Sequence, residues 1–194
     1  MATTFERIMD DAVKKGVIPA KTTEARKWFR TQAKNTTTNP TKLMREERGQ
    51  MVTRPTIGRM YLFNYDPKLK DELPYYDTFP LIFMVGPAEG GFYGLNMHYL
   101  PFTLRARLMD ALYGLSTDQS YDEDTRLRLS YRVLKAAGKY KFFKPTFKHY
   151  LRSKVKSRFV EIYADQWDMA LFLPLSRFKK ASESKVWSDS RKQV

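Results

Sequence analysis

The chemistry that this sequence suggests most strongly is the binding of anions by a run of cationic side chains. Between residues 126 and 158 there are twelve Lys and Arg residues and no Asp or Glu, in a chain whose net charge is +14. Cations that follow a nucleic-acid backbone neutralise its phosphates, so this segment is the predicted contact with a polyanion. The candidate nucleic-acid or partner-binding residues are Arg126, Arg128, Arg132, Lys135, Lys139, Lys141, Lys144, Lys148, Arg152, Lys154, Lys156 and Arg158.

Aromatic rings alternate with the cations in the middle of this segment. Tyr140, Phe142, Phe143 and Phe147 have the type and spacing to stack on exposed bases. Rings at 142, 143, 147 and 150 also fit the stripe of a buried helix, and we interpret them as core residues. The cations are expected to face a polyanion, which is either DNA or the acidic surface of an assembly partner. Charge alone does not separate these two partners.

Groups that catalyse reactions are scarce. The chain has no Cys, which excludes thiol nucleophiles and thiolate metal sites, and it has two His. His98 is predicted to be a hydrogen-bonded residue at the edge of the core, and His149 lies among cations that disfavour its protonation and metal binding. No HExxH, P-loop or GxGxxG spacing occurs. We therefore predict no catalytic residue, no metal site, no cofactor, and no hydrolase, transferase or redox activity.

One cluster of acids has the composition of a metal-dependent nuclease site, which needs carboxylates and a nearby lysine. The residues involved are Asp66, Asp71, Glu72 and Asp77, with Lys68 and Lys70 between them. An Asp-Pro pair followed by a charged run is also typical of a turn in water. We adopt the solvated turn as the interpretation and keep a nuclease as the least favoured alternative.

The elements that must position these residues centre on residues 58–101. Three apolar or aromatic runs, at 60–65, 80–85 and 92–100, are separated by Asp-Pro, Leu-Pro and Gly-Pro breakers. This pattern predicts three antiparallel strands in a small barrel-like (SH3-like) sheet. The apolar run at 158–163 is predicted to return to that sheet as a closing strand, because its side chains otherwise have no face to bury.

Helices are predicted on both sides of these strands. Thr3 and Glu6 have the spacing of a capping box, which opens a helix that ends at Gly16, and a second helix is expected over 22–34. After Pro101, a helix to about Tyr113 and another over 122–137 are expected. On the latter, the cations Arg128, Arg132, Lys135 and Lys139 step along the side opposite Leu127, Tyr131 and Leu134.

Together these elements predict an α+β fold of one core domain. The expected division is an N-terminal helical arm (1–50), a core domain (51–178) with a helical insertion (102–157), and a polar tail (179–194). No stretch of about eighteen apolar residues is present, so no membrane insertion is expected. The N-terminus fits neither a secretory signal nor a transit peptide.

Several segments carry a resemblance to a known protein family. They are IGRMYLFNYDPKLKDELPYYDTFPLIF (57–83), GFYGLNMHYLP (91–101), LRARLMDAL (104–112), LSYRVL (129–134) and WDMALFLP (167–174). With them, most of residues 4–190 resembles the small basic virion proteins of T-even-like contractile-tailed phages, of the DNA end protector or structural protein type. The match is to an overall pattern, so no site residue is carried over.

The resemblance implies a location in the virion, and in the host cytoplasm during assembly. It implies other virion proteins as partners, a double-stranded DNA end as a possible partner, and an oligomeric state in the particle. The favoured hypothesis is a non-enzymatic assembly protein whose basic face (126–158) contacts packaged DNA or its end. The alternative is a neck, tail or baseplate subunit that docks acidic proteins without binding DNA, and a head-completion nuclease is the lesser alternative.

Overall fold

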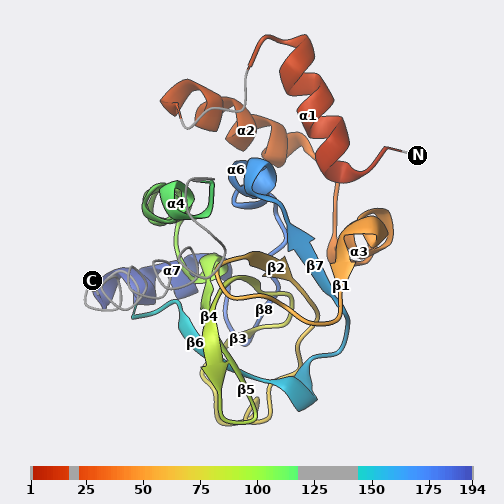
Figure 1. The fold of residues 1–194 in the computed structure, drawn as a ribbon. Coiled ribbons are helices and arrows are strands. Elements are labelled where there is room, and N and C mark those ends of the chain that lie inside the picture. The colour runs from red at the N-terminus through yellow and green to blue at the C-terminus, as the bar shows by residue number, and fades with distance from the viewer. Residues whose placement is uncertain (1, 18–21, 118–143, 194) are drawn as a thin grey trace.

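The centre of the fold is a six-stranded sheet in which every neighbouring pair of strands is antiparallel. The computed structural model describes residues 2–17, 22–117 and 144–193 (Figure 1). The strand order is β1-β7-β2-β4-β5-β6. The bounds are β1 (Met51–Val52), β2 (Met60–Leu62), β4 (Leu81–Ala88), β5 (Gly91–Asn96), β6 (Phe147–Leu151) and β7 (Phe159–Ile162).

The described part of the chain also contains six α-helices and a separate two-stranded sheet. Figure 1 shows α1 and α2 at one end of the molecule, α6 between them and the sheet, and the β4–β5 hairpin at the opposite end. This arrangement confirms the predicted α+β class. The bounds are α1 (Thr4–Lys14), α2 (Thr23–Asn35), α3 (Pro40–Glu46), α4 (Phe102–Thr117), α6 (Trp167–Ala170), α7 (Glu183–Lys192), β3 (Tyr76–Asp77) and β8 (Phe178–Lys179). Among the described helices, none is long and apolar enough to cross a membrane.

The predicted capping box at the start of α1 is confirmed. The Glu6 N–H donates to the Thr3 hydroxyl over 3.2 Å, and the Thr3 N–H donates to the Glu6 carboxylate over 2.8 Å. These bonds satisfy N–H groups that have no partner inside the helix. At the other end Gly16 has a φ of +66°, the left-handed conformation that ends many helices. The buried side of α1, which includes Phe5 and Ile8, packs into the main core.

The two faces of the central sheet bury two separate clusters. Along β2 and just beyond, Met60 and Leu62 belong to the main core under the helices, whereas Tyr61 and Phe63 belong to a second, aromatic cluster. This alternation follows from the two-residue period of a strand. The residues of the aromatic cluster are Tyr61, Phe63, Tyr65, Ile82, Met84, Phe92, Tyr150 and Phe159.

The sheet curls around the aromatic cluster but does not close into a barrel in the described part of the chain. Strands β1 and β6 are its two edges and do not pair with each other. The chain after β6 folds across instead: Val155 bridges to Tyr65, and the Asp66 N–H donates to the Lys154 carbonyl over 3.0 Å. The predicted strands in 58–101 are therefore confirmed, and the barrel-like closure is replaced by this connection.

The closing strand is confirmed as β7. It pairs with β2, with Met60 opposite Ile162, and it also pairs with β1, with Met51 opposite Val160. β7 therefore lies between the two and completes the sheet with a strand from near the C-terminus. The helix expected over 122–137 lies outside the described residues.

The prediction that the helical insertion extends to residue 157 is wrong. Residues 147–151 form strand β6 and residues 152–154 a short 3-10 turn. The rings at 147 and 150 alternate sides of a strand instead of sharing a helix stripe: Phe147 is exposed and Tyr150 is buried. Cross-strand pairing with β5 supplies the backbone partners that decide between the two structures.

The C-terminal residues add a helix that the polar composition did not predict. In α7, Val186 is fully buried and the Trp187 indole donates to the His98 carbonyl over 2.9 Å. Arg105 of α4 lies with its guanidinium 5.5 Å from the Trp187 ring and is itself 1% exposed. The proposed division into arm, core and tail remains a prediction, but this helix packs on the core.

Candidate nucleic-acid interface

The structure describes six of the twelve predicted binding residues. Lys144 and Lys148 lie before and on β6, Arg152 and Lys154 lie in the turn after it, and Lys156 and Arg158 lead into β7. The remaining six lie outside the described residues: Arg126, Arg128, Arg132, Lys135, Lys139 and Lys141. The charged residues in the connection between β6 and β7 are thus all cations.

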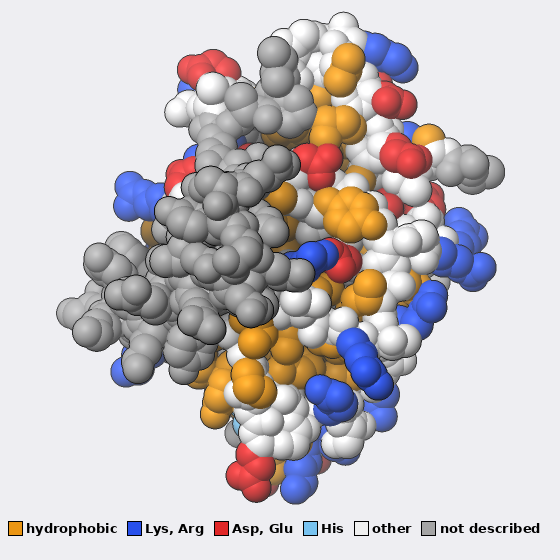
Figure 2. Space-filling view, in the orientation of Figure 1, with side chains coloured by type: hydrophobic (Ala, Val, Ile, Leu, Met, Phe, Trp, Pro, Cys, Tyr) orange, Lys and Arg blue, Asp and Glu red, His pale blue; other side chains and the backbone are white. Residues whose placement is uncertain are grey.

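Most of these cations are available to an external anion. Lys144, Arg152, Lys156 and Arg158 are exposed, and Lys154 is half-buried. Within the part of the chain that the structure describes, none of these five makes an ion pair. Figure 2 shows Lys and Arg side chains gathered along the right-hand side of this face, from α3 down to the β6–β7 connection. We call the exposed and half-buried cations of residues 144–158, without Lys148, the outer basic strip.

Lys148 differs from its neighbours because it points inward. It is half-buried, and its ammonium lies 4.1 Å from the centroid of the Tyr99 ring. Burial lowers the pKa of Lys148 to about 8. Among the described residues no carboxylate forms an ion pair with this ammonium, and the Tyr99 ring lies against it instead.

A cavity of about 460 Å³ lies beside Lys148, and we call it the aromatic cavity. Its walls come from the loop after β2, from β3, from the end of β5 and from β6, so segments far apart in sequence meet there. The lining is rich in tyrosine and carries one lysine, one histidine and one acid, Asp77, whose carboxylate is taken up by its own buried hydrogen bonds. It consists of Tyr65, Pro67, Leu73, Pro74, Tyr75, Tyr76, Asp77, Asn96, Tyr99, Phe147, Lys148, His149, Tyr150 and Gln193.

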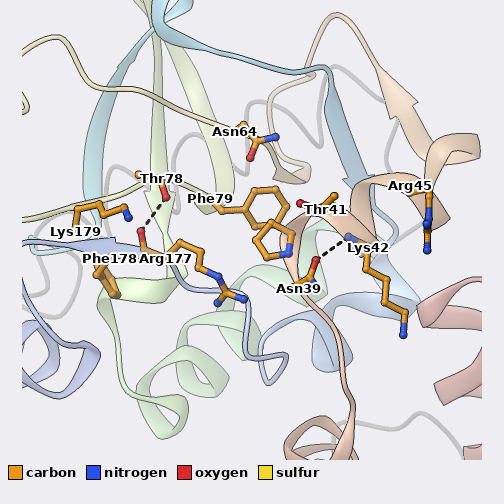
Figure 3. A pocket seen from close by; sticks show the side chains of 11 residues that line it. Asn39, Thr41, Lys42, Arg45, Asn64, Thr78, Phe79, Arg177, Phe178 and Lys179 are labelled. Carbon is orange, nitrogen blue, oxygen red and sulfur yellow. Dashed lines mark hydrogen bonds between the residues drawn. The ribbon is translucent and has the colours of Figure 1, made fainter.

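A second cavity, of about 740 Å³, opens between α3 and β8, and we call it the basic cavity (Figure 3). Four of its lining residues are cations and none is acidic. In Figure 3 Lys42 and Arg45 lie on the α3 side, Lys179 lies on the opposite side, and the Arg177 guanidinium lies between the two sides. The lining is Asn39, Pro40, Thr41, Lys42, Arg45, Asn64, Thr78, Phe79, Arg177, Phe178 and Lys179.

Local hydrogen bonds hold the walls of the basic cavity. The Asn39 side chain caps α3 by accepting from the Lys42 N–H over 2.9 Å. On the opposite wall the Thr78 hydroxyl donates to the Arg177 carbonyl over 3.1 Å. Asn64 joins this cavity to the outer basic strip, because its carbonyl accepts the Lys156 N–H over 2.8 Å.

Asp77 is buried at the wall of the aromatic cavity, next in sequence to Thr78 and Phe79 of the basic cavity, and its environment corrects the prediction of a solvated turn. It is 4% exposed, and its carboxylate accepts four hydrogen bonds, from the Phe79 and Arg177 N–H groups, the Asn96 amide and His98 Nδ1. Asp66, by contrast, forms an ordinary i,i+4 ion pair with Lys70 at 3.2 Å. The sequence around Asp66, Asp71, Glu72 and Asp77 did not indicate which of these acids would be buried.

The Asp77–His98 pair has a defined protonation state. Burial alone would raise the pKa of Asp77, but His98 and the backbone N–H donors outweigh it, so the pKa of Asp77 is lowered. Burial lowers the pKa of His98 despite the attraction of Asp77. His98 Nε2 has no partner among the described residues, as suits a neutral ring that donates through Nδ1. The prediction of a hydrogen-bonded core histidine is confirmed.

Sequence reasoning missed the basic cavity. Lys42 and Arg45 are more than a hundred positions from Arg177 and Lys179, and no spacing rule connects them. In the described part of the chain no group of three or more His, Asp and Glu residues could hold a metal ion. The cations and rings at this surface can bind anions and flat groups.

Comparison with known protein families gives a match over nearly the whole chain. The family model described as phage T4 terminal DNA protecting protein matches residues 1–191, nearly the whole chain. No curated protein and no solved structure matches the chain.

Proposed function

The chain belongs to the family of phage T4 terminal DNA protecting proteins, and on this premise we propose that it binds the end of packaged double-stranded DNA through the cations of residues 126–158. Membership makes it a structural phage protein that protects DNA ends, and a component of the virion. The proposal identifies the surface that binds the DNA end and gives the physical basis of that binding.

The observation that carries the proposal is that the cations of the outer basic strip are not paired with carboxylates of the described residues. Its five cations have no ion-pair partner among the described residues, although 21 acids are present in the chain. A cationic stretch without internal partners repels itself, and phosphates remove that repulsion. Each phosphate that is neutralised also releases counterions, which favours binding at low salt.

The proposed mechanism is non-enzymatic. A protein that covers the terminal base pairs blocks the access of an exonuclease to the DNA end. Such protection requires binding affinity and a suitable geometry, but no covalent bond is made or broken. The basic cavity supports the same role, because it adjoins the strip through Asn64 and adds four cations without an acid. We further propose other virion proteins as partners, an oligomeric state in the particle, and the host cytoplasm as the place of assembly.

The test is binding of labelled duplex DNA, with open ends or with both ends capped by hairpins, across a range of salt concentrations. We expect tighter binding to open ends and a log–log salt slope of roughly −0.9 per phosphate contacted. The triple variant Arg152→Glu, Lys156→Glu, Arg158→Glu is expected to lose this binding while it keeps its fold.

A matched control reverses three exposed lysines on the N-terminal helices, Lys14, Lys27 and Lys34, and changes the net charge equally. Its DNA binding is expected to fall much less, because these lysines lie on α1 and α2. An equal loss of DNA binding in both triple variants would indicate that binding depends only on the overall charge of the protein. Weak DNA binding by the wild type at low salt, with failed particle assembly in the first variant, would favour docking to acidic proteins instead. Metal-dependent cleavage of DNA would revive the nuclease hypothesis.

A further inference from the structure

We propose that the aromatic cavity holds an unpaired nucleotide at the DNA end, with a phosphate on Lys148 and the base against the surrounding rings. This inference rests on the proposed function and deepens it, because it names the feature that distinguishes an end from continuous duplex. A base can enter a cavity only when it has left the stack, and terminal bases leave most easily.

The cavity has the size and lining of a site for a flat ligand. Its volume of about 460 Å³ lies within the range of roughly 300–1,000 Å³ that is usual for small-molecule sites. Tyr75, Tyr76 and Tyr99 are among its lining residues. Two residues of β6 also line it: Phe147, which is exposed and stacks on Tyr93 with ring centroids 4.9 Å apart, and the buried Tyr150. Every base has a face that stacks on such rings, so the site would accept an end of any sequence.

Lys148 indicates that the occupant is an anion. An ammonium taken out of water without a carboxylate partner costs stability, and the ring of Tyr99 offsets only part of this cost. An apolar side chain would fill the same space without that cost. A phosphate oxygen at this position would supply the missing countercharge, which is why a nucleotide fits better than an uncharged aromatic compound.

The position of Lys148 links the cavity to the proposed phosphate surface. It lies in the middle of β6, whereas Lys144 and Arg152 lie just beyond the two ends of the same strand and are exposed. β6 is an edge strand of the sheet, so no further strand of that sheet covers its outer side. A duplex held on the outer cations would therefore bring its last nucleotide to the cavity.

The experiment uses the full chain and duplexes that carry a single unpaired 2-aminopurine at the end, with hairpin-capped duplexes of the same length as the comparison. Stacking in the cavity is expected to quench the 2-aminopurine fluorescence on binding. Lys148→Met and Phe147→Ala are each expected to lower the affinity for the open end about tenfold and the affinity for capped duplex much less. Phe147 is 45% exposed, so its removal leaves the fold intact.

Lys144→Met is the matched control, since it removes the same charge outside the cavity. We expect it to weaken open and capped duplexes by the same factor. Absence of quenching, or equal effects of Lys148→Met on open and capped duplexes, would overturn the inference. If the wild type binds both duplexes equally well, the phosphate surface stands and this inference alone fails. If it binds neither at low salt, the proposed function fails and the inference falls with it.

Discussion

His98 Nδ1 lies 2.7 Å from Asp77 Oδ2, and this buried contact ties the turn after β5 to strand β3. The same carboxylate accepts the Arg177 N–H, and so holds the start of β8 beside β3. Asp77 lines the aromatic cavity and Arg177 the basic cavity. One buried carboxylate therefore sets the distance between the two candidate binding surfaces.

Removing that carboxylate is expected to destabilise the protein strongly. Asp77→Ala leaves four donors without an acceptor in the interior, and the loss of one partner of a buried charged contact costs about 3–5 kcal/mol. Urea unfolding followed by circular dichroism measures this loss. Asp71→Ala, at an exposed acid of the same region, is the control and is expected to change the free energy of unfolding by less than about 0.5 kcal/mol. Similar values for the two variants would contradict the role given to Asp77.

The lowered pKa of His98 predicts a loss of stability on mild acidification. Below its ordinary pKa of 6.5 the unfolded state takes up a proton that the folded state resists, so the free energy of unfolding falls as the pH decreases below about 6.5. In His98→Gln the amide still donates to Asp77 but does not titrate, so this decrease is expected to flatten. Thermal unfolding across the pH range tests this, with His149→Gln, at an exposed ring, as the control that keeps the wild-type slope.

Lys148→Met is expected to stabilise the isolated protein at neutral pH, by about 1–3 kcal/mol, since each unit of pKa shift corresponds to about 1.4 kcal/mol. Because burial lowers the pKa of Lys148 to about 8, wild-type stability should rise as the pH increases from 8 toward the ordinary value of 10.5. The advantage of the variant should shrink over the same interval. Thermal unfolding at several pH values measures both trends, and a destabilised variant at pH 7 would argue that the ammonium serves the fold.

Gly91→Ala is expected to detach β6 from the sheet. A Cβ at Gly91 would lie 1.8 Å from the Tyr150 carbonyl oxygen, so the strand that carries Lys148 must move away. We expect a loss of more than about 2 kcal/mol in the free energy of unfolding, together with weaker DNA binding. Gly49→Ala is the control, because no atom lies within 4 Å of its added Cβ and its stability should stay near the wild type. Hydrogen exchange of the β6 amides locates the change.

The sequence by itself determined the features that depend on neighbours along the chain. The Thr3–Glu6 capping box, the stripe that includes Phe5 and Ile8, and the strands around Met60 and Leu81 follow from local hydrogen bonds and periodicity, and the structure has them. The excess of cations between residues 126 and 158 also follows from the sequence alone, because charge is a property of composition. The same holds for the absence of thiol chemistry.

The tertiary structure decided what depends on partners distant in sequence. Pairing with β5 made residues 147–151 a strand instead of a helix, and this turned Phe147 outward and Tyr150 inward. Packing decided that Asp77 is internal while Asp66 pairs with Lys70 near water. Packing also turned Lys148 toward the Tyr99 ring, whereas the cations of the outer basic strip remain available to an external anion. Burial and long-range pairing arise only when remote segments meet, so no local pattern could distinguish these residues from their neighbours.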